Sequence, residues 1–340
     1  MRLNNKKMMV LLGCALAALS TVTASAQMLI NGAGATFPYP IYSKWFNEYA
    51  KVDPSVRFNY QSIGSGGGQA QILAETVDFG ASDGPMSDEK LAKAPRAIWH
   101  LPTVAGADVI TYNLEGFPKL QLDGAAIAGI FLGKITKWND PIIKSANKGV
   151  ALPNADIVVI HRSDGSGTTY AWSDYLSKVS SDWKTAVGAS TTLNWPVGTG
   201  VEHNEGIAAM VQRSPNSIGY VELVYAIQHQ LSFGAVRNAA GEYIRANLES
   251  VTAAAASAMT GNSASPSSIT NASGKEAYPI ATFTFLLLPQ HIADNQKKAT
   301  LIELLQWLLT SGQRECSALG YAPLPHDIAN RQLQSLNSLK

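Results

Sequence analysis

Cysteine is nearly absent from this sequence of 340 residues, which contains only Cys14 and Cys316. Cys14 lies in an N-terminal segment that we expect to be removed, so no disulfide can form within the remaining chain. The fold must therefore be stabilised by its apolar core rather than by cross-links. Cys316, which has no partner, is predicted to be a small buried apolar residue rather than a nucleophile.

Net charge is also nearly absent. The 26 basic and 25 acidic residues almost cancel, and without the first 26 residues, which hold three basic and no acidic side chains, the net charge is about −2. Such a surface argues against a nucleic-acid or anionic-membrane partner. The sequence has no Walker motif for ATP hydrolysis and no cluster of His, Cys and acidic residues with metal-ligand spacing. We therefore expect neither a cofactor nor a metal.

Beyond the N-terminus, no apolar run is long enough to cross a bilayer. At the N-terminus, three basic residues precede the apolar run Met8–Leu19, and an Ala-Ser-Ala sequence ends at Ala26. This pattern predicts a signal peptide over residues 1–26, cleaved after Ala26, in preference to lipid attachment at Cys14. The remaining 314 residues exceed what one core comfortably organises, which favours two lobes.

After Gln27, strand-like and helix-like segments alternate along the chain. The apolar run 157–160 and the segment 278–289 are typical of buried strands, whereas 301–309 has the spacing of an amphipathic helix. This alternation predicts an α/β fold with a mostly parallel sheet. Residues 251–275 are rich in Ala, Ser and Asn, and we assign them no definite structure. Ligands of such folds bind beyond the carboxyl ends of the strands.

The most informative turn follows the buried strand at 157–160. It carries Arg162 and Asp164, then the run Gly165–Thr169, and then a helix-like segment. Free backbone N–H groups at a helix start, hydroxyls and a guanidinium together suit an oxyanion. The alternative is an ordinary capped helix beside an ion pair.

Two earlier turns repeat this chemistry. Thr36 lies in a Gly/Ala/Thr segment before the helix-like run 41–50, and Ser65 begins Ser-Gly-Gly-Gly before another helix-like run. Both hydroxyls occupy positions where a helix cap is expected. One such hydroxyl is usually only a cap, but three turns of this kind indicate one shared anion.

A fourth segment adds an acid, Asp83, within Gly80-Ala-Ser-Asp-Gly84. The segment formally matches the G-x-S-x-G nucleophile elbow, but Pro85 intervenes where a helix should begin and no histidine is marked as a base. Asp83 could instead cap the following helix or close a turn. It could also accept a hydrogen bond from a protonated oxyanion, which would favour phosphate over sulfate because only phosphate carries a proton at neutral pH.

Seven segments together resemble the periplasmic phosphate-binding proteins of high-affinity ABC phosphate importers. In chain order they are GAGATFPYPIYSKW, QSIGSGGG, TVDFGASDGPMSDEKL, FLGKITKWND, RSDGSGTTY, NEGIAAMVQR and SIGYVE. The resemblance implies a two-lobed, type II periplasmic binding protein of the α/β class with two crossing strands. It places lobe 1 at residues 27–111 plus 282–340 and lobe 2 at 112–281, with crossings near 110–113 and 280–283.

The resemblance also implies a function without catalysis. The exported chain would bind inorganic phosphate in the periplasm as a monomer and deliver it to the membrane permease of an ABC importer. The implied phosphate contacts are Thr36, the backbone N–H of Phe37, Ser65, Asp83, Arg162, Ser166, Gly167 and Thr168. Asp164 would hold the guanidinium of Arg162. One departure is Gly66, because the family often has a second serine there.

Two alternatives to phosphate delivery stay open at this point. A phosphate-ester hydrolase would need a nucleophile or metal at the anion, whereas the sequence offers hydroxyls and amides. A binder of another tetrahedral oxyanion would need a different role for Asp83.

Overall fold

The computed structural model describes residues 27–116, 118–257, 268–336 and 339. The predicted signal peptide and its cleavage after Ala26 lie outside these residues, as does part of the segment 251–275. In the described part of that segment, a helix covers Leu248–Ala256 and is capped by Asn247, whose side chain accepts from the backbone N–H of Ser250.

The strands are β1 (Met28–Gly34), β2 (Val56–Ser62), β3 (Phe79–Ser82), β4 (Ile98–Tyr112), β5 (Gln121–Leu122), β6 (Val158–Arg162), β7 (Thr199–Val201), β8 (Ser217–Glu222), β9 (Ser232–Phe233), β10 (Ala235–Arg237), β11 (Tyr243–Ile244) and β12 (Ala281–Pro289). The α-helices are α1 (Tyr39–Val52), α2 (Ser65–Leu73), α3 (Asp88–Ala92), α4 (Gly124–Phe131), α5 (Pro141–Ala146), α6 (Gly167–Val179), α7 (Ser181–Ala186), α8 (His203–Arg213), α9 (Leu223–Gln228), α10 (Leu248–Ala256), α11 (Asn295–Leu309) and α12 (His326–Ser335). Among the described residues, short 3-10 helices include η2 (Ser311–Glu315) and η3 (Ser317–Leu319). The predicted alternation of strands and helices is confirmed.

The main sheet has the strand order β2-β1-β3-β12-β4-β8-β6-β7, with β9 paired to β4. Pairing is parallel within β2-β1-β3 and within β8-β6-β7, as predicted, but β12 and β4 run antiparallel to each other and to their outer neighbours. The prediction of a mostly parallel sheet therefore holds only within the two outer groups of strands.

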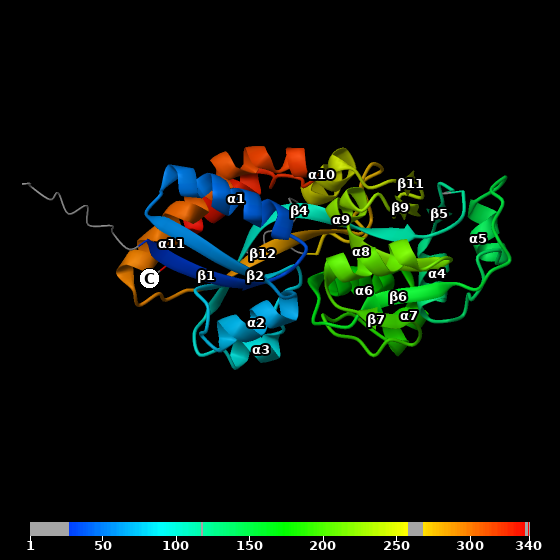
Figure 1. The fold of residues 1–340 in the computed structure, drawn as a ribbon, viewed down its shortest axis with the longest axis horizontal. Coiled ribbons are helices and arrows are strands. Elements are labelled where there is room, and N and C mark those ends of the chain that lie inside the picture. The colour runs from blue at the N-terminus through cyan, green and yellow to red at the C-terminus, as the bar shows by residue number, and fades with distance from the viewer. Residues whose placement is uncertain (1–26, 117, 258–267, 337–338, 340) are drawn as a thin grey trace, which may run out of the picture.

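Strand β4 connects the two halves of the molecule. Its residues 98–107 pair with β12, whereas residues 108–112 pair with β8. In Figure 1, β1, β2, α1, α2 and α11 lie on one side of this strand pair, and β6, α4, α6 and α7 lie on the other. The chain thus passes from one half to the other along a single long strand.

Each half has an aromatic core. In the N-terminal half, Tyr42, Phe46 and Phe79 pack around the ring of Tyr60. In the other half, Trp172 stacks on Tyr220 with ring centroids 4.7 Å apart. Cys316 is fully buried, as predicted. These cores stabilise the fold without a cross-link, because each large aromatic side chain removes a large apolar area from water.

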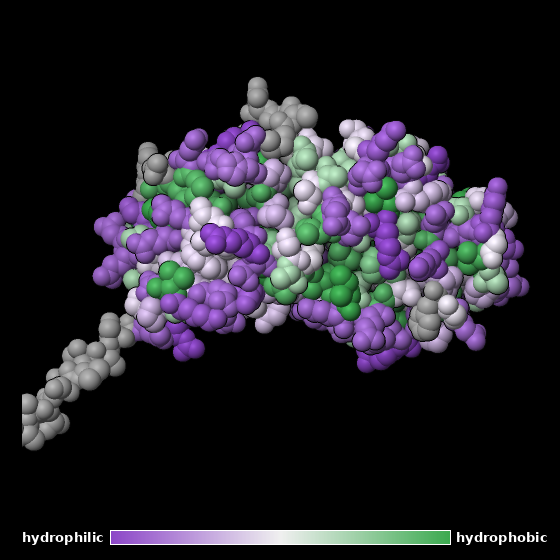
Figure 2. Space-filling model, turned by 90° about the horizontal axis from the view of Figure 1, so that it is seen from above, coloured by the Kyte–Doolittle hydropathy of each residue, from purple (hydrophilic) through white to green (hydrophobic). Residues whose placement is uncertain are grey.

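Apolar residues that remain exposed are scattered over different elements, for example Leu29, Val52, Ile142 and Ile227. On the face shown in Figure 2, hydrophilic residues cover much of both halves, and apolar residues form separate patches between them. Scattered exposed apolar residues are normal on a protein surface. None of the helices in the described part of the chain has the length and apolar character needed to cross a membrane.

Candidate anion site

The Gly/Ser/Thr turns that the sequence singles out meet where the two halves face each other. The backbone N–H of Gly66 donates to the carbonyl oxygen of Gly165 over 2.7 Å. A Cβ atom added at Gly167 would lie 2.4 Å from Oδ2 of Asp83 and 2.5 Å from Oγ of Ser65. The turn after β2, the end of β3 and the turn after β6 are therefore in direct contact, although the third lies far along the sequence from the other two.

Arg162 ends β6 and is nearly fully buried, with 2% of its surface exposed. Its Nε donates to Oδ1 of Asp164 over 2.6 Å, and a second guanidinium nitrogen bonds the other carboxylate oxygen. Burial alone would lower the pKa of Arg162, but the bonds to Asp164 raise it above its ordinary value. Likewise, burial acts to raise the pKa of Asp164, but its bonds to Arg162 lower it. The guanidinium is thus a fixed, fully charged donor, held as predicted by Asp164.

Helix α6 begins at Gly167, one short turn after Arg162. Ser166 is its N-cap, and the side chain accepts from the backbone N–H of Thr169 over 3.0 Å. Ser166, Gly167 and Thr168 are buried at this helix start. The free N–H groups of the first turn and the helix dipole favour an anion there.

The expected caps at the other two turns are not present. Helix α1 begins at Tyr39 after Pro38, and helix α2 begins at Ser65 itself after Gly64. Neither Thr36 nor Ser65 caps a helix, because each lies away from the N-cap position. Both hydroxyls are instead turned to tertiary partners: Thr36 Oγ1 lies 2.8 Å from Nδ2 of Asn204, and Ser65 Oγ lies 3.2 Å from the backbone N of Asp83.

Phe37 follows Thr36 and is fully buried. Its carbonyl oxygen accepts from the hydroxyl of Tyr321 over 2.7 Å, and its ring packs beside that tyrosine with centroids 6.2 Å apart. A Cβ atom added at Gly106 would lie 2.6 Å from the Phe37 ring, so glycine makes room for it. The backbone around Phe37 is therefore held in place from both sides.

Asp83 is the acid of this cluster, with 2% of its surface exposed. Its Oδ1 accepts from the hydroxyl of Thr284 over 2.7 Å, and its Oδ2 lies 3.3 Å from Oγ of Ser65. Burial raises the pKa of Asp83 to about 7, although the bond from Thr284 and the charge of Arg162 oppose that rise. The carboxyl group therefore titrates near neutrality.

The helix-cap and nucleophile-elbow interpretations of the Asp83 segment are wrong. Helix α3 is capped by Ser87, whose hydroxyl accepts from the N–H of Lys90, so Asp83 is not that cap. Ser82 is no exposed nucleophile: it is fully buried and accepts from Nε2 of Gln69 over 3.0 Å. No helix starts behind Ser82, because α3 begins only at Asp88. Within the described ranges, no group of three His, Cys, Asp or Glu side chains could hold a metal ion.

Several side chains around the cluster are not among the sequence predictions. Asn204 contacts Thr36 and Thr168, and Thr284 donates to Asp83. Asp108 and Glu222 are fully buried acids on paired positions of β4 and β8. Burial, reinforced by the charge of Asp83, raises the pKa of both well above the ordinary range. The signal for Asn204 lies in the segment NEGIAAMVQR, which carries the resemblance but from which no contact was predicted.

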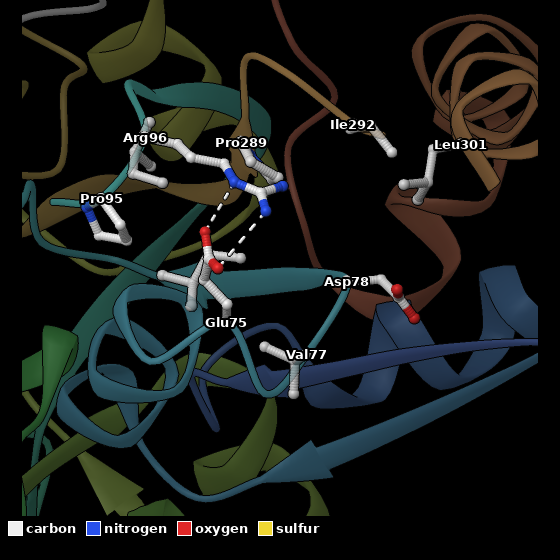
Figure 3. A pocket seen from close by; sticks show the side chains of 10 residues that line it. Glu75, Val77, Asp78, Pro95, Arg96, Pro289, Ile292 and Leu301 are labelled. Carbon is white, nitrogen blue, oxygen red and sulfur yellow. Dashed lines mark hydrogen bonds and ion pairs between the residues drawn. The ribbon is translucent and has the colours of Figure 1, made fainter. Parts of the chain in front are cut away.

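A separate cavity of about 200 Å³ lies in the N-terminal half and contains none of the predicted site residues. Figure 3 shows its apolar walls, with Arg96 reaching across to Glu75. The ion pair between these two side chains spans 2.7 Å, and Asp78, which also lines the cavity, is paired with Lys297 at 2.8 Å. Because its charges are already paired, this cavity offers no unpaired cation to an anion.

Comparison with known proteins places this geometry in context. Residues 21–311 match the PBP superfamily domain. The chain is 44% identical over 319 residues to the phosphate-binding protein PstS of Xylella fastidiosa (strain Temecula1), covering 92% of this chain and 87% of that one. It is also 44% identical over 313 residues to PstS of Pasteurella multocida, covering 91% and 90%. The chain belongs to the Pst-type phosphate-binding protein family.

Solved structures agree on the fold. A high-affinity periplasmic phosphate-binding protein called PfluDING, bound with phosphate, superposes with a TM-score of 0.73 at 20% identity, covering 91% of this chain and 94% of that one. A phosphate-binding protein from Stenotrophomonas maltophilia gives a TM-score of 0.68 at 19% identity, covering 91% and 94%. The predicted fold, a two-lobed type II periplasmic binding protein with crossing strands, is confirmed.

Proposed function

We propose that this chain binds inorganic phosphate and delivers it to the membrane permease of an ABC phosphate importer. The observation that carries the proposal is the buried pair of Arg162 and Asp164, set at the start of helix α6 beside hydroxyls from the opposite lobe. A fixed guanidinium and free backbone N–H groups are the donors that a phosphate requires. The relatives that share 44% of the sequence carry the name phosphate-binding protein.

We assign the phosphate contacts to the residues that the resemblance implies. Lobe 1 supplies the hydroxyl of Thr36, the N–H of Phe37, the hydroxyl of Ser65 and the carboxyl of Asp83. Lobe 2 supplies the donors that follow β6, namely Arg162, Ser166, Gly167 and Thr168. The burial of these residues and the contacts between their turns support one common site.

Asp83 is the acceptor in this set and sets the choice of anion. When ionised, it accepts a hydrogen bond from the P–OH of phosphate but repels sulfate, which has no proton to offer. Its position 3.3 Å from Ser65 supports this role, because that hydroxyl belongs to the proposed donors.

Each lobe contributes contacts, so the ligand favours the closed arrangement of the two lobes. We propose lobe 1 at 27–111 plus 282–340 and lobe 2 at 112–281. The change of partner along β4, from β12 at Ala107 to β8 at Asp108, supports a division near these bounds. The chain would act as a monomer in the periplasm after cleavage at Ala26.

Catalysis is not part of the proposed function. The hydroxyls at the site act as donors, and Ser82, the serine of the Gly80–Gly84 segment, is buried and bonded to Gln69. A binder of another tetrahedral oxyanion would not need an acidic acceptor at Asp83.

Isothermal titration of the purified chain with phosphate, arsenate and sulfate tests the proposal. We expect tight binding of phosphate and at least a hundredfold weaker binding of sulfate, on the order of 3 kcal/mol in binding free energy. Incubation with a chromogenic phosphate ester serves as the test for catalysis. Equal affinity for sulfate, or turnover that is lost when Arg162 is replaced, would overturn the proposal.

A further inference from the structure

Asn204 lies at the beginning of helix α8 and is fully buried between the two lobes. Its Nδ2 is 2.8 Å from Oγ1 of Thr36, in lobe 1, and 3.3 Å from Oγ1 of Thr168, in lobe 2. One amide group therefore touches both of the threonine hydroxyls that we assign to the anion.

The orientation of this amide is set by its other end. Oδ1 of Asn204 lies 3.0 Å from the backbone nitrogen of Glu222. A backbone N–H can only donate, so the atom facing Glu222 must be the amide oxygen. It follows that the NH₂ group, which has no acceptor capacity, faces Thr36 and Thr168.

The direction of the threonine protons follows from counting donors. A hydroxyl has one proton to donate and two lone pairs to accept. Thr168 Oγ1 accepts from Asn204 and, over 3.5 Å, from the guanidinium of Arg162, and neither partner can accept in return. Thr36 Oγ1 likewise accepts from Asn204. Each hydroxyl proton is therefore not used on Asn204 or Arg162 and is available for another acceptor.

The backbone next to Asn204 is held in an unusual conformation. His203 has a φ of 66°, in the left-handed region that non-glycine residues seldom adopt. In this conformation the N–H of His203 donates to Oδ1 of Asp164 over 3.2 Å. A backbone conformation of this kind costs energy, so it persists only where the surrounding contacts hold it in place. The turn thus supports the partner of Arg162 and places the amide of Asn204 at the same time.

We propose that Asn204 is a positioning residue: its amide directs the hydroxyl protons of Thr36 and Thr168 toward the bound anion. The inference rests on the proposed phosphate site. A simpler role, in which Asn204 only ties the lobes together, would affect stability but not the direction of the hydroxyls.

The variant Asn204→Asp separates the two roles. The carboxylate has the shape of the amide and can still accept from the N–H of Glu222, but it offers the threonines an acceptor in place of a donor. Both hydroxyls then turn toward residue 204, and a negative charge lies near the anion. We expect the phosphate Kd to rise roughly 10- to 100-fold. As pH falls, the new carboxyl gains a proton that it can donate, so the ratio of variant to wild-type Kd should shrink; burial should make this change begin above the ordinary pKa range of aspartate.

Asn147→Asp is the matched control. Asn147 is also buried, accepts from the N–H of Gln121 over 2.8 Å and donates through Nδ2 to two backbone carbonyl oxygens. It lies after helix α5, away from the proposed contacts. This control should lower the melting temperature without changing the phosphate Kd.

A double-mutant cycle completes the test, with Thr168→Val as the second change. If Asn204 acts through this hydroxyl, removing the hydroxyl costs much less affinity in the Asn204→Asp protein than in wild type. If the Asp variant does not fold, the same cycle is run with Asn204→Ala. Three results would overturn the inference: additive losses in the cycle, a Kd for Asn204→Asp within threefold of wild type, or a Kd ratio that does not change with pH. If the wild type still binds phosphate, the proposed function stands even then. Absence of phosphate binding by the wild type would overturn both.

Discussion

Gly66→Ala should weaken phosphate binding although residue 66 is not among the proposed contacts. Gly66 lies in the first turn of helix α2, with its backbone against Gly165 of the opposite lobe. An added Cβ would lie 2.8 Å from Cα of Gly165, where two carbon atoms ordinarily stay about 3.5–4.0 Å apart. Backbone lies on both sides of this contact, so neither side yields as a flexible side chain would.

The size of the effect follows from what is lost on closure. Separating the turns weakens or breaks the 2.7 Å hydrogen bond from Gly66 to Gly165, a bond worth about 0.5–1.5 kcal/mol. That loss alone corresponds to roughly a 2- to 13-fold rise in Kd, and the steric contact adds to it. In an open arrangement of the two lobes these turns would not touch, so the substitution should act mainly by raising the dissociation rate of phosphate. Alanine is also a better helix former than glycine by about 1 kcal/mol, so the variant should not unfold.

The assay is stopped-flow tryptophan fluorescence with phosphate, supported by small-angle scattering with and without ligand. We expect faster dissociation and a smaller decrease in the radius of gyration on phosphate addition than in wild type. Gly274→Ala is the control, because its added Cβ would make an ordinary 3.4 Å contact with Ala277. A Gly66→Ala protein that is folded and binds within twofold of wild type would refute the reasoning, since the two turns could not then be in contact in the bound form.

Three further predictions concern the charged groups. Arg162→Ala should raise the phosphate Kd by roughly 12- to 150-fold in calorimetry, because a charged hydrogen bond is worth about 1.5–3 kcal/mol. Asp83→Asn should lower the phosphate-to-sulfate affinity ratio. In wild type this ratio should also decrease at pH values below about 7, because the Asp83 carboxyl then gains a proton that it can donate to sulfate. Asp108 has a raised folded pKa, so its protonated form stabilises the fold at low pH and that contribution is lost as pH rises through the raised pKa. Asp108→Asn should therefore raise the melting temperature at pH 8 but not at pH 4.

Much of the fold follows from periodicity alone. The leucines of 301–309 repeat at helical spacing, and α11 buries Leu301, Leu304 and Leu308 as that spacing requires. The full length of strand β4 could not be predicted, because Pro102 normally excludes a central strand. The register of β4 and β12 shifts between Thr284 and Phe285, and Pro102 pairs with Phe285 at that irregularity, which accommodates a residue without an N–H. Neither the bulge nor the antiparallel course of β12 could be predicted from the local sequence.

The site was predictable only in part. Arg162, Asp164 and Ser166 act within one short turn, so their spacing already indicates their contacts. Thr36 and Ser65 were interpreted as helix caps because local rules favour such hydroxyls there, but their partners are tertiary. The partner of Thr36 lies 168 positions away in the sequence, and no local pattern marks that amide as different from an ordinary helical residue.

The charges around the site explain why the direction of its dipoles matters so much. Arg162 is the buried cation among the proposed contacts, but Asp164 already balances its charge. Asp108 and Glu222 add no positive charge, and burial raises the pKa of each well above its ordinary value; burial also raises the pKa of Asp83, to about 7. A bound anion therefore meets almost no net positive charge. Its binding energy must come from hydroxyl and N–H donors that already point at it, since a donor that must first reorient loses part of its interaction energy.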